Sequence, residues 1–283
     1  MMKALTRRNG APDGARPLSS RTVAPFLRAS LLLALLAGPA AAADPLAIMR
    51  AYCQADGRGD RLAASTWSAV APLVAWNLEP AWDRLHLIRG FEIGTPQRRD
   101  GVVDIDVKYT LFADVSADGV RRAERIESRR YVLEPSGERG WRLRGPPPPP
   151  YIFESQADAA ALAALLSPDD PVYLSNSAFV WNLLRDAGWE IAHSNTADLP
   201  SAAGYTSERT ANVGDLVLYY ADGTPYHVGM VESDDAVVSS TLNGGIRRTP
   251  FGAFAGEIRY LRPAAEPAAT PTAPPPGRQI PAP

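Results

Sequence analysis

The stretch VYLSNSAFVWNLLRDAGW, residues 172–189, predicts a helix and decides how the second half of this chain is interpreted. Its apolar side chains recur at the spacing of one helix face: Val180, Leu183, Leu184 and Ala187. Gly188 follows at the place where a helix favours a residue with left-handed backbone after its last turn. We therefore expect a helix from about 176 to 187, with Asn176 at its start.

Four segments after this helix have the apolar patterning of β-strands. They are VGDLVLYY (213–220), YHVGMVES (226–233), AVVSSTL (236–242) and GEIRYLRP (256–263). A single helix followed by this series of strands predicts an α+β arrangement for the second half of the chain.

Over about 170–262, this order of elements resembles the NlpC-type and CHAP-type cell-wall amidases and peptidases of the papain-like superfamily. The runs NSAFV, GDLVLYY and HVGMV stand where those enzymes have a cysteine-led helix start, a Gly-Asp-Leu-Val strand and a His-Val-Gly strand. The resemblance implies a papain-like domain over 153–262, in which the helix packs on an antiparallel sheet.

The resemblance also implies a role for each matching position. His227 matches the general-base histidine, and Gly214 with Asp215 matches the pair that opens the strand. Asn176 stands in place of the nucleophilic cysteine. Of the catalytic triad that the resemblance implies, only the general base is therefore intact.

The third member of that triad, which orients the histidine, falls near residue 239 in the resemblance. The chain has Ser239 and Ser240 there, and either hydroxyl could face the histidine, because the register of the hairpin is not fixed by sequence. If the enzyme is active, Ser239 is the expected third member. The binding groove that the resemblance implies is lined by Asn176, Ser177, Asp215, His227 and Ser240.

Asn176 cannot perform the covalent step of a cysteine enzyme, because an amide has no ionisable nucleophile. An asparagine at a helix start can accept a hydrogen bond from a backbone N–H, so we expect Asn176 to cap the helix. Ser177 is the alternative nucleophile, but one residue along a helix turns the side chain by about 100°. His193 is expected in a loop. The chain has three histidines in distant contexts, so neither a metal site nor a cofactor is expected.

These substitutions make an inactive relative of cysteine peptidases and amidases the favoured interpretation, with non-covalent binding of a peptidoglycan peptide or an envelope protein. The first alternative is an active cell-wall amidase or peptidase that uses His227 as base with a serine or water. The second is a purely structural protein whose groove is filled by its own side chains. An open cleft beside His227 would favour binding or catalysis, and a filled one would favour structure.

The first half, residues 44–145, combines predicted helices with alternating strand patterns. DPLAIMRAYCQADGRG (44–59) and RLAASTWSAVAPLVAW (61–76) have helical spacing, and Pro72 bounds the second of them. Strand patterns follow in RLHLIRGFEIG, VVDIDVKYTLFADV, AERIESRRYVLE and GWRLRG. Helices followed by a curved antiparallel sheet resemble the SnoaL-like, cystatin-like α+β cone. The fold class expected for the whole chain is therefore α+β.

The chemistry-bearing residues of this half are interpreted as structural. Cys53 is expected to be buried on a helix, and His86 is expected to be a hydrogen-bonded strand residue. A run of arginines is expected to form a solvated strand face paired with glutamates, although it could also meet an acidic ligand. These are Arg121, Arg122, Arg125, Arg129 and Arg130, with Glu124, Glu127 and Glu134.

Three further segments complete the predicted organisation. Residues 1–43 join a basic stretch to the apolar run ASLLLALLAGPAAAA, which predicts a signal peptide cleaved after Ala43 and a periplasmic or secreted protein without a membrane anchor. Residues 146–152, PPPPPYI, predict a polyproline spacer between two domains. Residues 263–283 are rich in Pro and Ala and predict a disordered tail.

The charge of the chain excludes one class of partner. The formal net charge is −2. Removal of the leader, with its excess of basic residues, makes the chain more acidic, whereas nucleic-acid binding requires a concentrated positive surface. We therefore expect no nucleic-acid partner.

Overall fold

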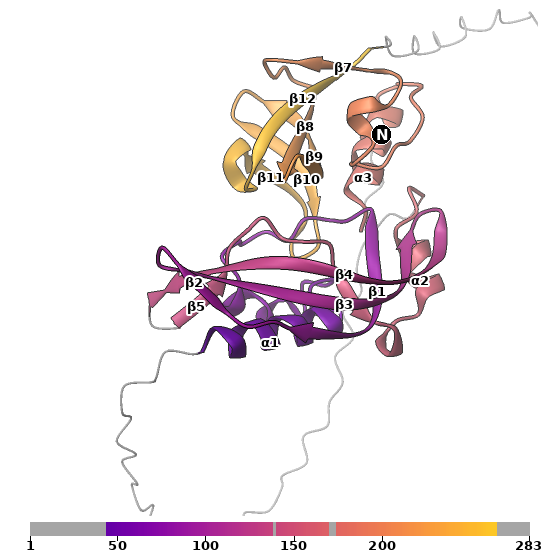
Figure 1. Cartoon of the computed structure of the whole chain (residues 1–283). Coiled ribbons are helices and arrows are strands. Elements are labelled where there is room, and N and C mark those ends of the chain that lie inside the picture. The colour runs from indigo at the N-terminus through magenta and orange to yellow at the C-terminus, as the bar shows by residue number, and fades with distance from the viewer. Residues whose placement is uncertain (1–43, 138–139, 170–173, 265–283) are drawn as a thin grey trace, which may run out of the picture. The chain divides into compact units, whose positions relative to one another are not determined.

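The computed structural model describes residues 44–137, 140–169 and 174–264, and all of them belong to one compact unit, Ala41–Pro283. This part of the chain is α+β, with two sheets and three α-helices (Figure 1). The predicted signal peptide lies outside the described residues, as does nearly all of the predicted tail. No helix in the described ranges is both long and apolar enough to cross a membrane.

The first sheet has the strand order β5-β4-β3-β1-β6, with β2 paired to β3. Its strands are β1 (Arg84–Ile93), β2 (Gln97–Arg99), β3 (Val102–Ser116), β4 (Gly119–Ser136), β5 (Gly140–Leu143) and β6 (Tyr151–Phe153). Every pair is antiparallel except β1 with β6, which is parallel. The four strand patterns predicted over residues 84–145 are confirmed. Alternate residues of β3 are buried against the core, as the period of a half-buried strand requires.

Helix α1 (Pro45–Gly57) is capped by the side chain of Asp44 and packs on this sheet (Figure 1). Its buried face includes Met49, Tyr52 and Cys53. Cys53 is 1% exposed and lies 3.5 Å from the hydroxyl of Tyr109, and burial raises the pKa of its thiol to about 12. The prediction that Cys53 is a buried residue on a helix is confirmed.

The second predicted helix, residues 61–76, is wrong. The structure has only two single 3-10 turns there, η1 (Trp67–Ala69) and η2 (Ala71–Leu73). Pro72 lies inside the second turn, and a proline cannot donate the hydrogen bond that a continuing α-helix needs. The apolar spacing of this segment instead places Val70 and Val74 in the core beneath the sheet.

The expectation of a polyproline spacer is corrected by the structure. Pro147, Pro148 and Pro150 are buried, and Tyr151 opens strand β6 inside the first sheet. The carbonyl of Pro148 accepts a hydrogen bond from buried Arg61 at 2.7 Å. A proline run has the same extended backbone whether it is solvated or packed, so its composition alone did not reveal this burial.

The boundary predicted at residue 153 is therefore too early. The turn η4 (Glu154–Gln156) and helix α2 (Ala159–Leu165) follow β6, and α2 contacts β3 and β4 of the first sheet. Leu166, at the end of α2, is buried in a core cluster that also includes Leu85, Leu87 and Val115. The first sheet and the helices packed on it, called the first layer below, thus continue to about residue 166.

The second sheet has the order β11-β10-β9-β8-β12-β7, and all of its paired strands are antiparallel. Its strands are β7 (Tyr205–Glu208), β8 (Leu216–Ala221), β9 (Thr224–Ser233), β10 (Ala236–Thr241), β11 (Gly245–Pro250) and β12 (Glu257–Pro263). The 3-10 turns η5 (Leu199–Ser201) and η6 (Phe251–Ala253) lie in its connections. The four predicted strands are confirmed as β8, β9, β10 and β12, whereas short, exposed β7 and β11 were not predicted.

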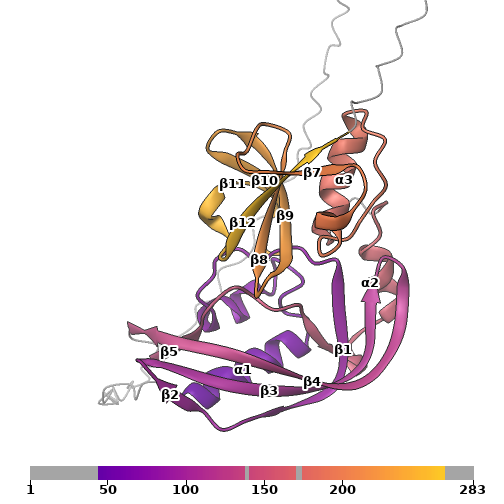
Figure 2. The same cartoon turned by 45° about the horizontal axis from the view of Figure 1, so that its top comes forward.

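Helix α3 (Asn176–Asp186) lies beside the second sheet and contacts β9 and β10 (Figure 2). Phe179, Val180 and Leu184 pack on Leu216 and Val228 of the sheet. The predicted helix is confirmed, and Gly188 has the expected left-handed backbone, with φ of 88°. The predicted cap is wrong: the side chain of Ser175, not Asn176, accepts the hydrogen bond from the N–H of Ala178.

Residues 79–83 connect the first layer to the second sheet by backbone hydrogen bonds. Ala81 N–H donates to the carbonyl of Ser240, and Leu242 N–H donates to the carbonyl of Glu79 at 2.8 Å. The Glu79 carboxylate is buried and pairs with buried Arg61 at 2.5 Å. This fixed segment brings Trp82 and Asp83 to the start of helix α3, where Trp82 N–H donates to the carbonyl of Leu174.

Candidate functional site

Asn176 and His227 lie side by side, as the resemblance predicts. The Asn176 side-chain N–H₂ donates to His227 Nδ1 at 3.1 Å and to the Tyr226 carbonyl at 3.4 Å. The other end of the amide, Oδ1, accepts a hydrogen bond from the Thr196 hydroxyl at 2.7 Å. Because an amide nitrogen can only donate, His227 Nδ1 is an acceptor and the ring proton lies on Nε2.

The His227 ring is sealed from solvent. It is 0% exposed, and its centroid lies 4.0 Å from that of Phe254 and 5.6 Å from that of Tyr219. Burial lowers the pKa of His227 to about 3, because the apolar surroundings disfavour the imidazolium. Its Nε2 has no hydrogen-bond partner among the described residues. This histidine is therefore neutral at physiological pH and has no surface exposed to solvent.

The structure does not pair Ser239 with His227. The Ser239 hydroxyl is buried on β10 and, like His227 Nε2, has no hydrogen-bond partner in the described part of the chain. The expectation that Ser239 orients the histidine is therefore corrected. Ser240 is also buried, at 1% exposure, and its backbone carbonyl is taken by Ala81.

Ser177 lies on the other side of the helix start and contacts Asp83 and His193, not His227. Its hydroxyl donates to Asp83 Oδ1 at 2.9 Å and lies 3.0 Å from His193 Nε2. Since a serine has a single proton and Asp83 takes it, His193 Nε2 donates to the Ser177 oxygen. Ser177 is 1% exposed, so this arrangement neither activates the hydroxyl nor presents it to a substrate.

His193 lies in a loop, as predicted, but its contact with Ser177 was not predicted. Burial lowers the pKa of His193, while the charges of Asp83 and Asp118 act in the opposite direction. The Trp181 ring meets the imidazole edge-on, with centroids 5.7 Å apart. These contacts hold His193 as a structural partner of the helix start.

Asp83 fills the N-terminus of helix α3. One carboxylate oxygen accepts from the Ser175 hydroxyl at 2.7 Å and from the Ser177 N–H at 3.1 Å, besides the Ser177 hydroxyl. The other oxygen accepts from the Thr196 N–H at 2.6 Å. A carboxylate is favoured at a helix N-terminus because free N–H groups and the helix dipole meet there. Here the Asp83 carboxylate is that anion.

Asp215 does not line this site. Its carboxylate forms a two-pronged pair with Arg262, with both N···O distances 2.9 Å, and accepts from the Asn212 N–H at 2.8 Å. Gly214 before it has a left-handed backbone, with φ of 91°. Asp215 therefore closes the turn into β8 and, through Arg262, connects this turn to β12. The assignment of Asp215 to the binding groove is corrected.

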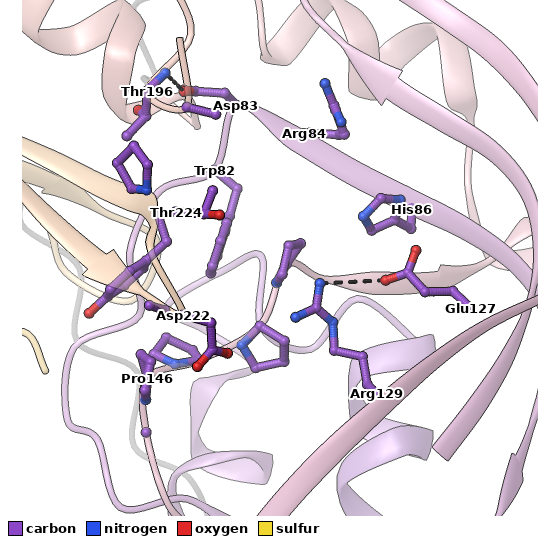
Figure 3. A pocket seen from close by; sticks show the side chains of 18 of the residues that line it. Trp82, Asp83, Arg84, His86, Glu127, Arg129, Pro146, Thr196, Asp222 and Thr224 are labelled. Atoms are coloured by element: carbon purple, nitrogen blue, oxygen red, sulfur yellow. Dashed lines mark hydrogen bonds and ion pairs between the residues drawn. The ribbon is translucent and has the colours of Figure 1, made fainter. Parts of the chain in front are cut away.

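The buried Asn176 and His227 side chains are called the sealed pair below. An open cleft of about 600 Å³ lies next to them (Figure 3). The first sheet contributes Arg84 and His86 from β1 and Arg125, Glu127 and Arg129 from β4. The segment after α3 contributes Thr196 and Asp198, and the β8–β9 hairpin contributes Asp222, Thr224 and Tyr226. The remaining walls are formed by Trp76, Trp82, Asp83 and the Pro146–Pro149 run. Sequence reasoning missed this cleft because its walls come from segments far apart in the chain.

One buried and one half-buried carboxylate organise the charges of the first-sheet wall. Asp114 lies 2.8 Å from His86 Nδ1 and also pairs with Arg121 and Arg125 at 3.2 Å. The hydrogen bond with His86 and the neighbouring arginine hold the pKa of Asp114 well below its usual range. The prediction of a hydrogen-bonded His86 is confirmed.

Glu127 is the second of these carboxylates. It accepts from the Tyr151 hydroxyl at 2.6 Å and pairs with Arg129 at 3.4 Å and Arg125 at 3.5 Å. Burial opposes ionisation of Glu127, but the Tyr151 hydrogen bond and the nearby positive charges outweigh it and lower its pKa. The predicted pairing of strand arginines with Glu127 is confirmed, and the same residues also form a wall of the cleft.

Comparisons with known proteins assign this chain to no family. No protein-family model matches this chain, and no curated protein and no solved structure matches it significantly. Within the ranges that the structure describes, no group of three His, Cys, Asp or Glu side chains is placed to hold a metal ion.

Proposed function

We propose that this is an exported binding protein, in which a domain related to the papain-like NlpC-type enzymes has lost its chemistry. The helix start beside the His-Val-Gly strand, with Asn176 next to His227, supports that relationship. Helix α1 on a long antiparallel sheet supports the SnoaL-like interpretation of the first layer. The leader sequence supports export to the periplasm or beyond.

The hydrogen bond between Asn176 and His227 is the observation that carries the loss of chemistry. A thiol enzyme needs an ionisable nucleophile beside a histidine that accepts its proton. Here an amide donates to a neutral imidazole that is 0% exposed. Nucleophile, proton acceptor and access to solvent are all absent from this pair.

The open cleft is the place that we propose for the ligand. A volume of about 600 Å³ lies within the range of small-molecule sites, which is about 300–1,000 Å³. Its charged and aromatic walls match a peptide better than an apolar molecule. We infer that the ligand is a peptidoglycan peptide or an exposed segment of an envelope protein.

Two other functions are less well supported. An active hydrolase with Ser177 is disfavoured because that hydroxyl is buried and bonded to Asp83. A hydrolase that uses water with His227 is disfavoured because the imidazole is fully buried and its pKa is about 3. A purely structural role fits the sealed pair but leaves the open, charged cleft without a use.

Sedimentation with purified, insoluble peptidoglycan tests this function. The full chain is incubated with the polymer, the pellet is assayed for protein, and the supernatant is assayed for released peptides and sugars. We expect the protein in the pellet and no released products. Release of peptides would overturn the loss of chemistry. Absence of the protein from the pellet, together with no binding of soluble envelope peptides, would overturn the binding function.

A further inference from the structure

Each of two opposite walls of the cleft carries an exposed charged side chain that forms no ion pair among the described residues, and the two charges have opposite sign. On the first sheet, Arg84 is exposed and has no ion-pair or hydrogen-bond partner among the described residues, in contrast to Arg125 and Arg129. Arg84 and His86 are two residues apart on β1, so their side chains leave the same face of the strand. Figure 3 shows the two side chains together on one side of the cleft.

His86 is held with one ring nitrogen turned to Asp114. Nδ1 makes the 2.8 Å contact with that carboxylate, and the ring stacks on Tyr151 with centroids 5.1 Å apart. Within the described chain, no hydrogen bond occupies Nε2, and the residue lines the cleft. The Arg84 guanidinium is therefore the docking point for a carboxylate, and the stacked His86 ring forms the wall beside it.

The opposite wall carries an exposed carboxylate on a tight turn. Asp222 and Gly223 join β8 to β9 with φ angles of 49° and 78°, which is the backbone of a two-residue hairpin turn. This turn fixes Asp222 at the edge of the cleft, across from Arg84 and His86 (Figure 3). Asp222 forms no ion pair in the described ranges, so its charge is available to a ligand.

Apolar surface lies between these charges. The rings of Trp82 and Tyr226, both of which line the cleft, are 6.2 Å apart between centroids and are tilted by 32°. Pro147 and Pro148 add further rigid apolar surface. Aromatic and proline faces bind the apolar parts of a ligand without losing much side-chain entropy.

From this arrangement we propose that the cleft binds a short peptide with both ends free. The peptide carboxylate binds Arg84, next to the His86 ring, and its ammonium group binds Asp222. A ligand with only negative charge, such as a phosphate ester, would gain at Arg84 but would be repelled by Asp222. This inference rests on the proposed binding function and narrows its ligand to a short peptide with a free ammonium group and a free carboxylate, in place of a segment within a longer protein chain.

Calorimetry with trialanine tests the assignment of the two ends. Three probes are compared with the full chain: trialanine with free ends, its C-terminal amide and its N-acetyl form. Because a charge-assisted hydrogen bond is about twice as strong as a neutral one, blocking either end should weaken binding about tenfold.

Two variants connect each end to its residue. Arg84→Gln should weaken binding of free trialanine about tenfold and leave binding of the amide unchanged. Asp222→Asn keeps a residue that tolerates left-handed backbone and should weaken free trialanine while leaving the N-acetyl form unchanged. Arg209→Gln and Asp234→Asn are matched controls, since both residues are exposed and lie outside the cleft, and each should bind as the wild type does.

The results separate this inference from the proposed function. Equal binding of all three probes, or equal losses in the cleft and control variants, would overturn the zwitterionic peptide. Sedimentation with peptidoglycan combined with no binding of trialanine would overturn the inference and leave the binding function standing. Failure of both assays would overturn both.

Discussion

The sealed pair and the open cleft lie next to each other, yet they treat polar groups in opposite ways. Asn176, Thr196 and His227 are almost fully buried and satisfy one another, apart from the single N–H on His227 Nε2. In the cleft, Arg84 and Asp222 are exposed and form no ion pair within the described part of the chain. The first region resembles a core, and the second resembles a binding site.

This difference shows why a match to a catalytic motif does not by itself locate a functional site. The residues that resemble a catalytic centre are those that the fold has buried. His227 packs among Phe254 and Tyr219 and accepts a hydrogen bond from the Asn176 amide, so its surroundings are those of a core residue. The exposed charges occur at positions that no motif identifies.

The largest expected effect follows from removing the carboxylate that closes the start of helix α3. Asp83→Ala leaves the Ser177 and Thr196 N–H groups and two hydroxyls without their acceptor. Each buried donor without a partner costs about 1–3 kcal/mol, so we expect a loss of roughly 3 kcal/mol in the free energy of unfolding. Chemical denaturation measures it.

Asp234→Ala is the matched control for that variant, because Asp234 is exposed and forms no ion pair among the described residues. It should change the unfolding free energy by less than about 0.5 kcal/mol. If Asp83→Ala is as stable as this control, Asp83 does not seal the helix start.

A smaller effect is expected from pH. His227 has a folded pKa of about 3, so between pH 6.5 and 3 the unfolded chain binds a proton there that the folded chain does not. Stability from this group is full above pH 6.5 and decreases as the pH falls. One pKa unit corresponds to about 1.4 kcal/mol, so the loss between pH 6.5 and 5 is on the order of 2 kcal/mol.

Other groups also titrate in this range, so the measurement compares wild type with His227→Gln, which has no proton to gain at this site. The difference between the unfolding free energies of wild type and His227→Gln should shrink by about 2 kcal/mol between pH 6.5 and 5. A difference that stays constant would mean that His227 titrates normally in the folded protein.

The smallest effect is expected for Asn176→Ala. This change removes the donor to His227 and the acceptor for Thr196, and should cost about 1–2 kcal/mol of unfolding free energy. Binding of a peptide in the cleft should not change, because the amide does not line the cleft. Loss of binding at unchanged stability would place the ligand at the sealed pair after all.

Local patterns in the sequence predict much of the second sheet. The spacing from Val180 to Ala187 locates helix α3, and apolar patterning locates β8, β9, β10 and β12. The pairing of Asn176 with His227 also follows from the resemblance. These features depend on residues close together in the chain or on a known order of elements.

The features that could not be predicted depend on contacts between distant segments. Asp83 and Ser177 are 94 residues apart, and no periodicity connects them. Ser175 competes with Asn176 for the cap, and both residue types are good caps, so only geometry decides. The proline run and the segment 79–83 are equally compatible with solvent and with burial until their neighbours are known.

The measurement that tests the central claim most directly is nuclear magnetic resonance of the histidine rings. The chain has only three histidines, so each ring can be assigned by single substitution. On addition of trialanine, the His86 ring signals should shift and the His227 signals should not. During titration from pH 8 to 5, His227 should remain neutral with its proton on Nε2. A His227 ring that titrates near 6.5, or that shifts with the peptide while His86 does not, would contradict the account.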